Sequence, residues 1–184
     1  MRRLNRALFS FACLTAVIAA APIWADATAD CNQSKDSDLG IRRCTELIRQ
    51  NPRNAVSYNN RGNAYHAKGD DDRAIADYNN ALQLNPKDAA SYYNRGRIYD
   101  DQGDYDRAIA DYNEALQLNP KSAVAYYNRG NAYYAKGDYD RAIADYNKAL
   151  QLNPEDAAAF YNRGVAYKKK GDYDRAMADY TKAL

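Results

Sequence analysis

Histidine and cysteine are scarce in this sequence, which removes most of the side chains from which catalytic and metal sites are built. The 184 residues include one histidine, His66, and three cysteines. A general base needs neighbouring groups that hold its ring and its proton in place. Neither a cysteine partner nor a repeated arrangement of carboxylates accompanies His66 in the sequence. We therefore expect a non-enzymatic protein without catalytic residues.

Calcium-binding loops and phosphate-binding loops are also missing. Aspartates cluster at residues 70–72 and 100–106, but without the spacing and the final glutamate of a calcium loop. Carboxylates at these places suit the positive N-termini of helices. Gly62, Gly96, Gly130 and Gly164 lie inside predicted helices and form no phosphate loop. The sequence thus predicts no metal site and no cofactor.

Without its N-terminal segment, the chain has no excess of positive charge. The chain has 26 basic and 24 acidic residues, and three of its arginines lie within the first six positions. Without those three, 23 basic residues remain against 24 acidic ones, a net charge of −1. Nucleic-acid binding depends on cationic groups that neutralise phosphates. The charge balance therefore predicts no nucleic-acid partner.

The N-terminal segment contains the one long apolar stretch, residues 7–21. Arginines precede it, and a small residue, Ala25, stands just before Asp26, as signal peptidase requires. We interpret residues 1–25 as a secretory signal, which places the mature chain in the periplasm or outside the cell without membrane contact. The alternative is an uncleaved anchor, because residues 7–24 number 18, near the shortest span of a bilayer.

Cleavage would remove Cys13 and leave only Cys31 and Cys44. Two cysteines in an oxidising compartment favour a disulfide. The alternative is a pair of free thiols. Asp30 precedes Cys31 where a lipoprotein would need a small residue, so we expect a protein without a lipid anchor.

A 34-residue unit recurs four times, starting at Asn51, Asn85, Asn119 and Asn153. Residues 85–118 and 119–152 are identical at 25 of 34 positions. Such a period is typical of a solenoid, in which each unit stacks on its neighbours because it cannot bury its apolar faces alone.

Each unit has the apolar pattern of two helices. In the third unit, Tyr126, Gly130 and Tyr133 recur with helical spacing, and a second series follows from Ala142 to Leu150. Gly137 separates the two series as a helix stop. The residues before the first helices are all good N-caps: Asn54, Asp88, Ser122 and Asp156. The sequence predicts an all-α fold of stacked antiparallel hairpins.

These residues resemble the signature of a tetratricopeptide repeat of the exported bacterial type. The residues that match are Tyr126, Gly130, Tyr133, Ala142, Tyr146, Ala149 and Pro154, with equivalents in every unit. The resemblance implies a right-handed α-solenoid. We divide the mature chain into an N-terminal capping arm and half-repeat helix at residues 26–54 and four repeats at 55–88, 89–122, 123–156 and 157–184.

One position departs from the family pattern. Arginine stands where the family more often packs an apolar side chain: Arg61, Arg95, Arg129 and Arg163. A buried guanidinium needs a partner. We expect each arginine to pair with the aspartate of its own second helix: Asp77, Asp111, Asp145 or Asp179. In the alternative, the arginines extend to solvent.

Residues 36–52 align with the second half of a repeat, with Cys44 at the tyrosine position. The first helix of this half-repeat is missing, so Cys44 should face an apolar groove. We expect a disulfide from Cys31 to Cys44 to hold the arm across this groove as an N-terminal cap. Closing a loop of this length is worth about 3 kcal/mol in the chain-entropy model.

The resemblance implies that the first helices line a concave groove that binds peptides. Between the two most similar repeats, eight of nine differences lie at the first helix or its boundaries. The predicted groove residues are Asn60, Asn63, Tyr93, Asn94, Arg97, Tyr127, Asn128, Asn131, Tyr134, Tyr161 and Asn162. The asparagines form a ladder whose amides can both donate to and accept from an extended peptide backbone.

The resemblance does not extend to the clamp with which some relatives bind C-terminal carboxylates. Asn59, Val124 and Asn128 stand where that clamp needs lysine or arginine. We predict an interaction scaffold in the cell envelope that binds an extended segment of another protein. Two alternatives are self-assembly through the last helix, which lacks a capping helix after Leu184, and a regulatory part of a longer protein.

Overall fold

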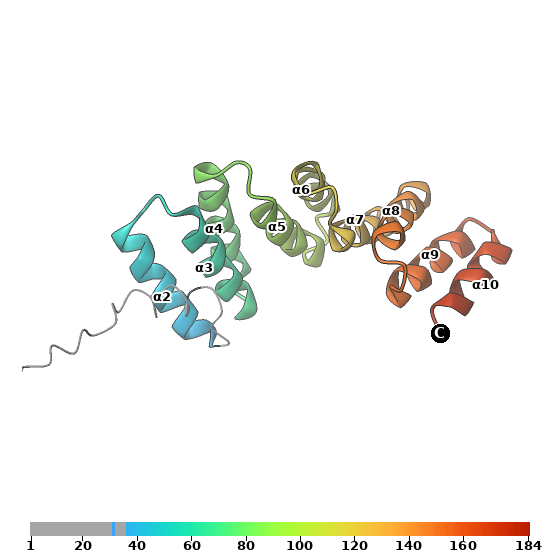
Figure 1. The fold of residues 1–184 in the computed structure, drawn as a ribbon, viewed down its shortest axis with the longest axis horizontal. Helices are drawn as coiled ribbons and strands as arrows, with labels where there is room; N and C mark the ends of the chain where they lie inside the picture. The colour runs from blue at the N-terminus through green and yellow to red at the C-terminus, as the bar shows by residue number, and fades with distance from the viewer. Residues whose placement is uncertain (1–30, 32–35) are drawn as a thin grey trace, which may run out of the picture.

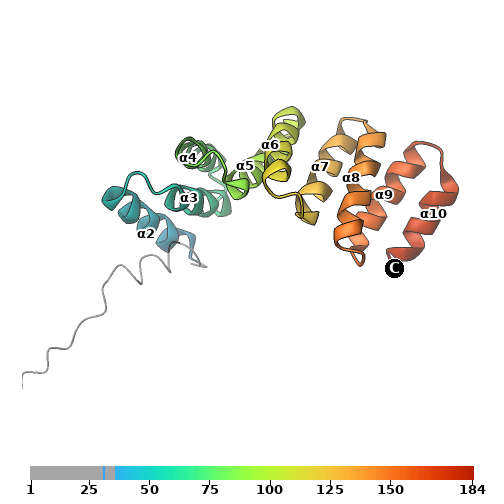
Figure 2. The same ribbon diagram turned by 45° about the horizontal axis from the view of Figure 1, so that its top comes forward.

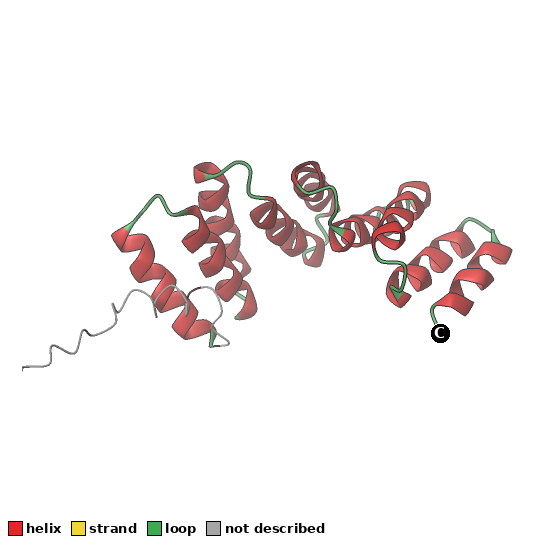
Figure 3. Cartoon of the chain, in the orientation of Figure 1, coloured by secondary structure: helices red, strands yellow, loops and turns green. Residues whose placement is uncertain are grey.

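The computed structural model describes Cys31 and residues 36–184, so the predicted signal and most of the predicted arm lie outside the described residues. The described residues form nine α-helices and no strand. Figures 1, 2 and 3 show these helices stacked side by side in one elongated array. In chain order they are α2 (Ser37–Gln50), α3 (Ala55–Ala67), α4 (Asp71–Leu84), α5 (Ala89–Asp101), α6 (Tyr105–Leu118), α7 (Ala123–Ala135), α8 (Tyr139–Leu152), α9 (Ala157–Lys169) and α10 (Tyr173–Lys182).

Each 34-residue unit forms one antiparallel hairpin, and α2 stands alone before the first. The first helices are α3, α5, α7 and α9, and each is followed by its second helix, α4, α6, α8 or α10. All four predicted N-caps are confirmed, as in the hydrogen bond of 3.2 Å from Ser57 N to Asn54 Oδ1. Gly137 between α7 and α8 has φ 80°, the left-handed conformation that favours glycine. The fold is the predicted all-α solenoid.

Small residues and tyrosines form the core of each hairpin. Tyr146 of α8 is buried against Gly130 of α7, where an added Cβ would lie 2.8 Å from the ring. Ala142 and Ala149 are also buried. The glycine therefore allows the two helices to approach closely enough for the tyrosine to fill the space between them.

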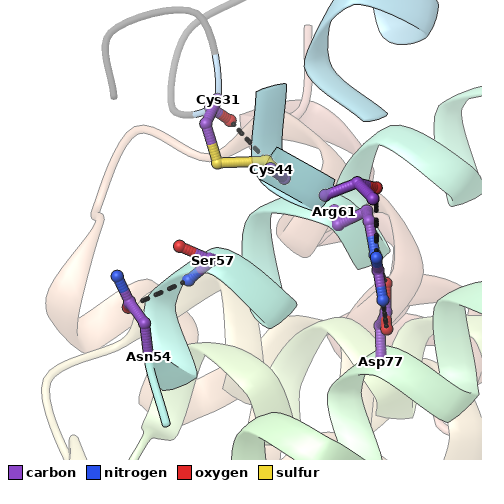
Figure 4. Close-up of a disulfide and its surroundings, with 7 residues drawn as sticks. Cys31, Cys44, Asn54, Ser57, Arg61 and Asp77 are labelled. Carbon is purple, nitrogen blue, oxygen red and sulfur yellow. Dashed lines mark hydrogen bonds and ion pairs between the residues drawn. A yellow bond between two sulfur atoms is a disulfide. The ribbon is translucent and has the colours of Figure 1, made fainter. Parts of the chain in front are cut away.

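The predicted pairs between arginine and aspartate are confirmed in all four repeats. Arg61 donates from Nε and Nη2 to both carboxylate oxygens of Asp77, at 2.7 and 2.8 Å (Figure 4). It also donates from Nη1 to Thr45 of α2. The same two-bond pair recurs in Arg95–Asp111, Arg129–Asp145 and Arg163–Asp179. Each arginine thus links three helices, and the alternative of arginines extended into solvent is wrong.

The first hairpin is covered at its N-terminal side by α2 and Cys31. The sulfurs of Cys31 and Cys44 lie 2.15 Å apart, and both side chains are buried (Figure 4). Cys31 borders a cavity of about 120 Å³ together with Gly40 of α2 and Asn60 of α3. The disulfide therefore places Cys31 over the surface where the half-repeat lacks its first helix.

Candidate interaction face

The predicted groove residues all lie on the four first helices, and we call this surface the first-helix face. Successive first helices contact one another along the stack. Asn63 and Tyr161 are exposed, and the other nine predicted residues are half-buried. The structure thus brings the predicted residues onto one continuous row of helices.

Side-chain amides connect each first helix to the one before it. Asn94 Nδ2 donates to Asn63 Oδ1 at 2.9 Å and to Asn59 Oδ1 at 3.3 Å. Asn162 Nδ2 donates in the same way to Asn131 Oδ1 at 3.0 Å and to Tyr127 Oη at 2.9 Å. Both hydrogens of each amide are therefore used within the protein. We expected every asparagine amide of the ladder to offer both a donor and an acceptor to a ligand. This expectation is wrong for Asn94 and Asn162, because only their Oδ1 atoms remain available to a ligand.

A single carbonyl oxygen serves two donors in the first and third repeats. Asn63 Oδ1 accepts from Asn94 and also from the hydroxyl of Tyr78, at 2.7 Å. Asn131 Oδ1 accepts from Asn162 and from the hydroxyl of Tyr146, at 2.8 Å. Burial raises the pKa of both tyrosines well above the ordinary value, which keeps the hydroxyls neutral donors.

The second repeat lacks this shared acceptor because Arg97 replaces the asparagine. Arginine has donors but no acceptor. Tyr112 is fully buried, and its hydroxyl has no hydrogen-bond partner among the described residues. Asn128 Nδ2 donates only to Tyr93 Oη, at 3.0 Å, so one of its two hydrogens is unused within the described part of the chain. Leaving a buried hydroxyl without an acceptor costs on the order of 1–3 kcal/mol.

Two charged side chains of α5, Arg97 and Asp100, lie near the Tyr112 hydroxyl. In the part of the chain that the structure describes, Arg97 takes part in no ion pair or side-chain hydrogen bond. Burial, with a further contribution from Asp101, raises the pKa of Asp100 to about 6. The Tyr112 hydroxyl faces the Asp100 carboxylate and favours its ionised form. The second repeat therefore has unpaired polar groups where its neighbours have a closed network.

The face tyrosines also pack inward against the second helices. The rings of Tyr93 and Tyr112 have centroids 6.0 Å apart, as do those of Tyr127 and Tyr146. Tyr161 packs on Tyr180 at 5.6 Å and is still 56% exposed. These contacts fix the positions of the rings. A partner that covers the exposed ring surface therefore causes little further loss of side-chain entropy.

Sequence reasoning missed contacts that join different helices at their ends. Lys136 pairs with Asp106 of the preceding repeat, and equivalent pairs join Lys68–Asp38 and Lys170–Asp140. In each of these pairs the lysine follows the aspartate by 30 residues, and this repeated spacing was visible in the sequence. His66 Nδ1 lies 2.7 Å from Asp71 Oδ1, a carboxylate neighbour that the sequence pattern did not indicate.

The described residues show neither a candidate metal site nor a candidate membrane-spanning helix. They contain no group of three or more histidine, cysteine, aspartate or glutamate side chains that could hold a metal ion. Among the helices described, none is both long and apolar enough to cross a bilayer.

Family models identify the repeat. A model described as TPR repeat matches residues 62–100, 96–137 and 130–171, and one described as tetratricopeptide repeat matches residues 44–76. These matches cover more than half of the chain, which therefore belongs to the tetratricopeptide repeat family. Such repeats generally mediate protein–protein interaction, so the chain is an interaction scaffold. The comparisons indicate no catalytic family.

Solved structures of MamA are similar to this chain over most of its length. One, described as the crystal structure of MamA, has 28% sequence identity and a TM-score of 0.79, and the match covers 90% of this chain and 94% of that one. A MamA chain from Desulfovibrio magneticus RS-1 has 23% identity and a TM-score of 0.80, with coverage of 87% and 90%. These likenesses support the tetratricopeptide fold. No curated relative matches the sequence.

Proposed function

We propose that the first-helix face binds an extended segment of another protein. The observation that supports this most directly is a row of amide oxygens at equivalent positions in successive repeats. Asn94, Asn128 and Asn162 are each held through Nδ2 by the preceding repeat. Their Oδ1 atoms accept no hydrogen bond within the described residues. The row therefore presents oriented acceptors to a ligand.

An extended peptide has the donors that such a row needs. Its backbone N–H groups point outward at regular intervals, and each can donate to one oriented Oδ1. Because the amides are fixed by their own hydrogen bonds, little side-chain entropy is lost on binding. The neighbouring tyrosines Tyr93, Tyr127 and Tyr161 add apolar surface beside the row.

A peptide-binding experiment tests this proposal. The immobilised protein is exposed to a mixture of random decapeptides with blocked termini, and retained peptides are identified by mass spectrometry. We expect retention by the natural protein and a loss of at least about tenfold in the double variant Asn128→Ala, Asn162→Ala. Gln83→Ala with Gln117→Ala is the matched control, because both glutamines are exposed on second helices. Equal retention by all three proteins would contradict binding on the first-helix face.

We also propose that the chain works in the cell envelope or outside the cell. The signal-like pattern of residues 1–25 and the pairing of Cys31 with Cys44 support this location. The test is expression with the native N-terminal segment, followed by mass measurement and titration of thiols under denaturing, non-reducing conditions. We expect a chain that begins at Asp26 and has no reactive thiol. Two reactive thiols, or an intact N-terminus, would count against an exported protein.

A second candidate function is self-assembly through the α9 and α10 end of the stack. A cavity of about 530 Å³ opens there between Tyr161, Met177 and Leu184. Met177 is 64% exposed, which is unusual for a large apolar side chain beside such a cavity. Sedimentation at several concentrations, with Met177→Glu as the comparison, separates this function from peptide binding. A strict monomer would exclude self-assembly.

A further inference from the structure

We infer that the second repeat selects peptides with an acidic side chain, whose carboxylate binds between Arg97, Asn128 and Tyr112. This inference rests on the proposed peptide binding and adds a specificity to it. It locates that specificity in the second repeat, where a donor, Arg97, replaces the asparagine acceptor of the first and third repeats.

The repeats themselves show where the missing oxygen belongs. In the third repeat, Asn131 Oδ1 lies 2.8 Å from the Tyr146 hydroxyl and 3.0 Å from Asn162 Nδ2. Asn63 Oδ1 occupies the equivalent place in the first repeat, with distances of 2.7 and 2.9 Å. In the second repeat, the corresponding donors are the Tyr112 hydroxyl and Asn128 Nδ2. An oxygen at this place would lie within hydrogen-bonding reach of both.

Apart from the Asp100 carboxylate, the polar groups around this place are donors. The Tyr112 hydroxyl has no partner among the described residues, and Asn128 Nδ2 has one hydrogen unused there. Arg97 adds a guanidinium that forms no ion pair with any described residue. A ligand that fits must therefore supply acceptors and negative charge, which is the chemistry of a carboxylate.

A carboxylate satisfies these donors better than an amide does. Its two oxygens can accept two parallel hydrogen bonds from a guanidinium and still accept from a neighbouring N–H. A glutamine side chain presents one oxygen and no charge. Arg97 and Asn128 are half-buried, whereas Tyr112 is fully buried. The carboxylate thus meets Arg97 and Asn128 first, and the hydroxyl donates from below.

Asp100 is the internal group that opposes this binding. It lies one turn after Arg97 on α5, and Asp101 follows it. When ionised it repels an incoming carboxylate, and it could instead attract a basic side chain. The Asp100→Asn variant is therefore expected to bind acidic peptides more tightly than the natural protein does. A preference for basic peptides would assign the site to Asp100 and overturn the inference.

The test uses three mixtures of decapeptides with blocked termini. Nine positions are randomised over uncharged residues, and the remaining central position is glutamate, glutamine or lysine. The natural protein, expressed with its own N-terminal segment, is immobilised, and retained peptide is measured for each mixture. We expect about tenfold more retention of the glutamate mixture than of the other two.

Arg97→Asn is the decisive variant because it copies the first and third repeats. It should retain the glutamate and glutamine mixtures equally, and its melting temperature should not fall, because the new amide gives Tyr112 an acceptor. Arg53→Asn, which removes an exposed arginine away from the face, should keep the preference for glutamate. Equal retention of the glutamate and glutamine mixtures by the natural protein would overturn the carboxylate subsite alone. Retention of none of the three mixtures would overturn the binding proposal itself.

Discussion

The second and third repeats share a scaffold but differ in the network on their first helices. Residues 85–118 and 119–152 are identical at 25 of 34 positions, and both hairpins have the same ion pair, caps and buried tyrosine. In the third repeat, Asn131 closes a network with the tyrosine hydroxyl and the next asparagine. In the second repeat, Arg97 leaves that network open. One side chain thus changes the chemistry of the face without changing the packing that supports it.

The ion pair between the two helices of each hairpin should be the most costly feature to break, and equally costly in both repeats. Removing one partner of a buried pair typically destabilises by 3–5 kcal/mol, because the other charge remains buried. We expect Asp111→Ala and Asp145→Ala each to lower the free energy of unfolding by about this amount. Urea denaturation measures it. A difference above about 1 kcal/mol between the two variants would show that the scaffolds are not equivalent.

Asp100 should make the stability of the second repeat depend on pH. The third repeat has Tyr134 at the equivalent position and should not show this dependence. Its pKa is raised from 3.8 to about 6 in the folded protein, so folding is favoured at low pH and this contribution is lost as pH rises through about 6. Asp100→Asn should therefore stabilise the protein at pH 7, by up to about 3 kcal/mol, and have little effect near pH 3.5. Thermal unfolding of both proteins across this range is the measurement.

The control for this effect is Tyr134→Asn at the equivalent position in the third repeat. Tyr134 packs on Tyr139 at 5.4 Å, so the variant loses some packing. That loss should not depend on pH between 3.5 and 7. If the benefit of Asp100→Asn were the same at both pH values, the carboxylate would not be the cause.

Much of the fold could be predicted from the sequence because it depends on local patterns. Helical spacing, N-caps and glycine stops recur with the period, and each acts within a few residues. The pairing of Arg129 with Asp145 was also predictable, because a buried charge requires an opposite charge and the same two residue types recur in every unit. Such features need no knowledge of how hairpins stack.

The candidate site could be predicted as a set of residues but not as a network. The replacement of Asn63 and Asn131 by Arg97 is visible in the sequence. Its consequence falls on Tyr112, 15 residues later, and on Asn128, 31 residues later. Which side-chain atoms meet across two hairpins depends on the stacking, which a one-dimensional pattern does not contain. The unused donors of the second repeat therefore appear only in three dimensions.

Exchanging the two network residues should move stability in opposite directions. Arg97→Asn gives Tyr112 and Asn128 an acceptor and should stabilise by about 1 kcal/mol. Asn131→Arg removes the acceptor of Tyr146 and should destabilise by about 1–3 kcal/mol. Chemical denaturation of the two single variants and the double variant measures both effects. Destabilisation by Arg97→Asn would show that Arg97 makes a stabilising contact that the repeat comparison does not account for.

The smallest expected difference between the two repeats lies at the ends of their first helices. Lys136 pairs with Asp106, but the second repeat has Gln102 at the equivalent position, 30 residues after Asp72. Gln102→Lys should form the missing pair and raise the melting temperature slightly, and Lys136→Gln should lower it slightly. Exposed pairs of this kind gain little free energy and are screened by salt, so both shifts should shrink at 1 M salt. A shift that persists at high salt would indicate packing of the lysine stem as its cause, because dispersion contacts are not screened.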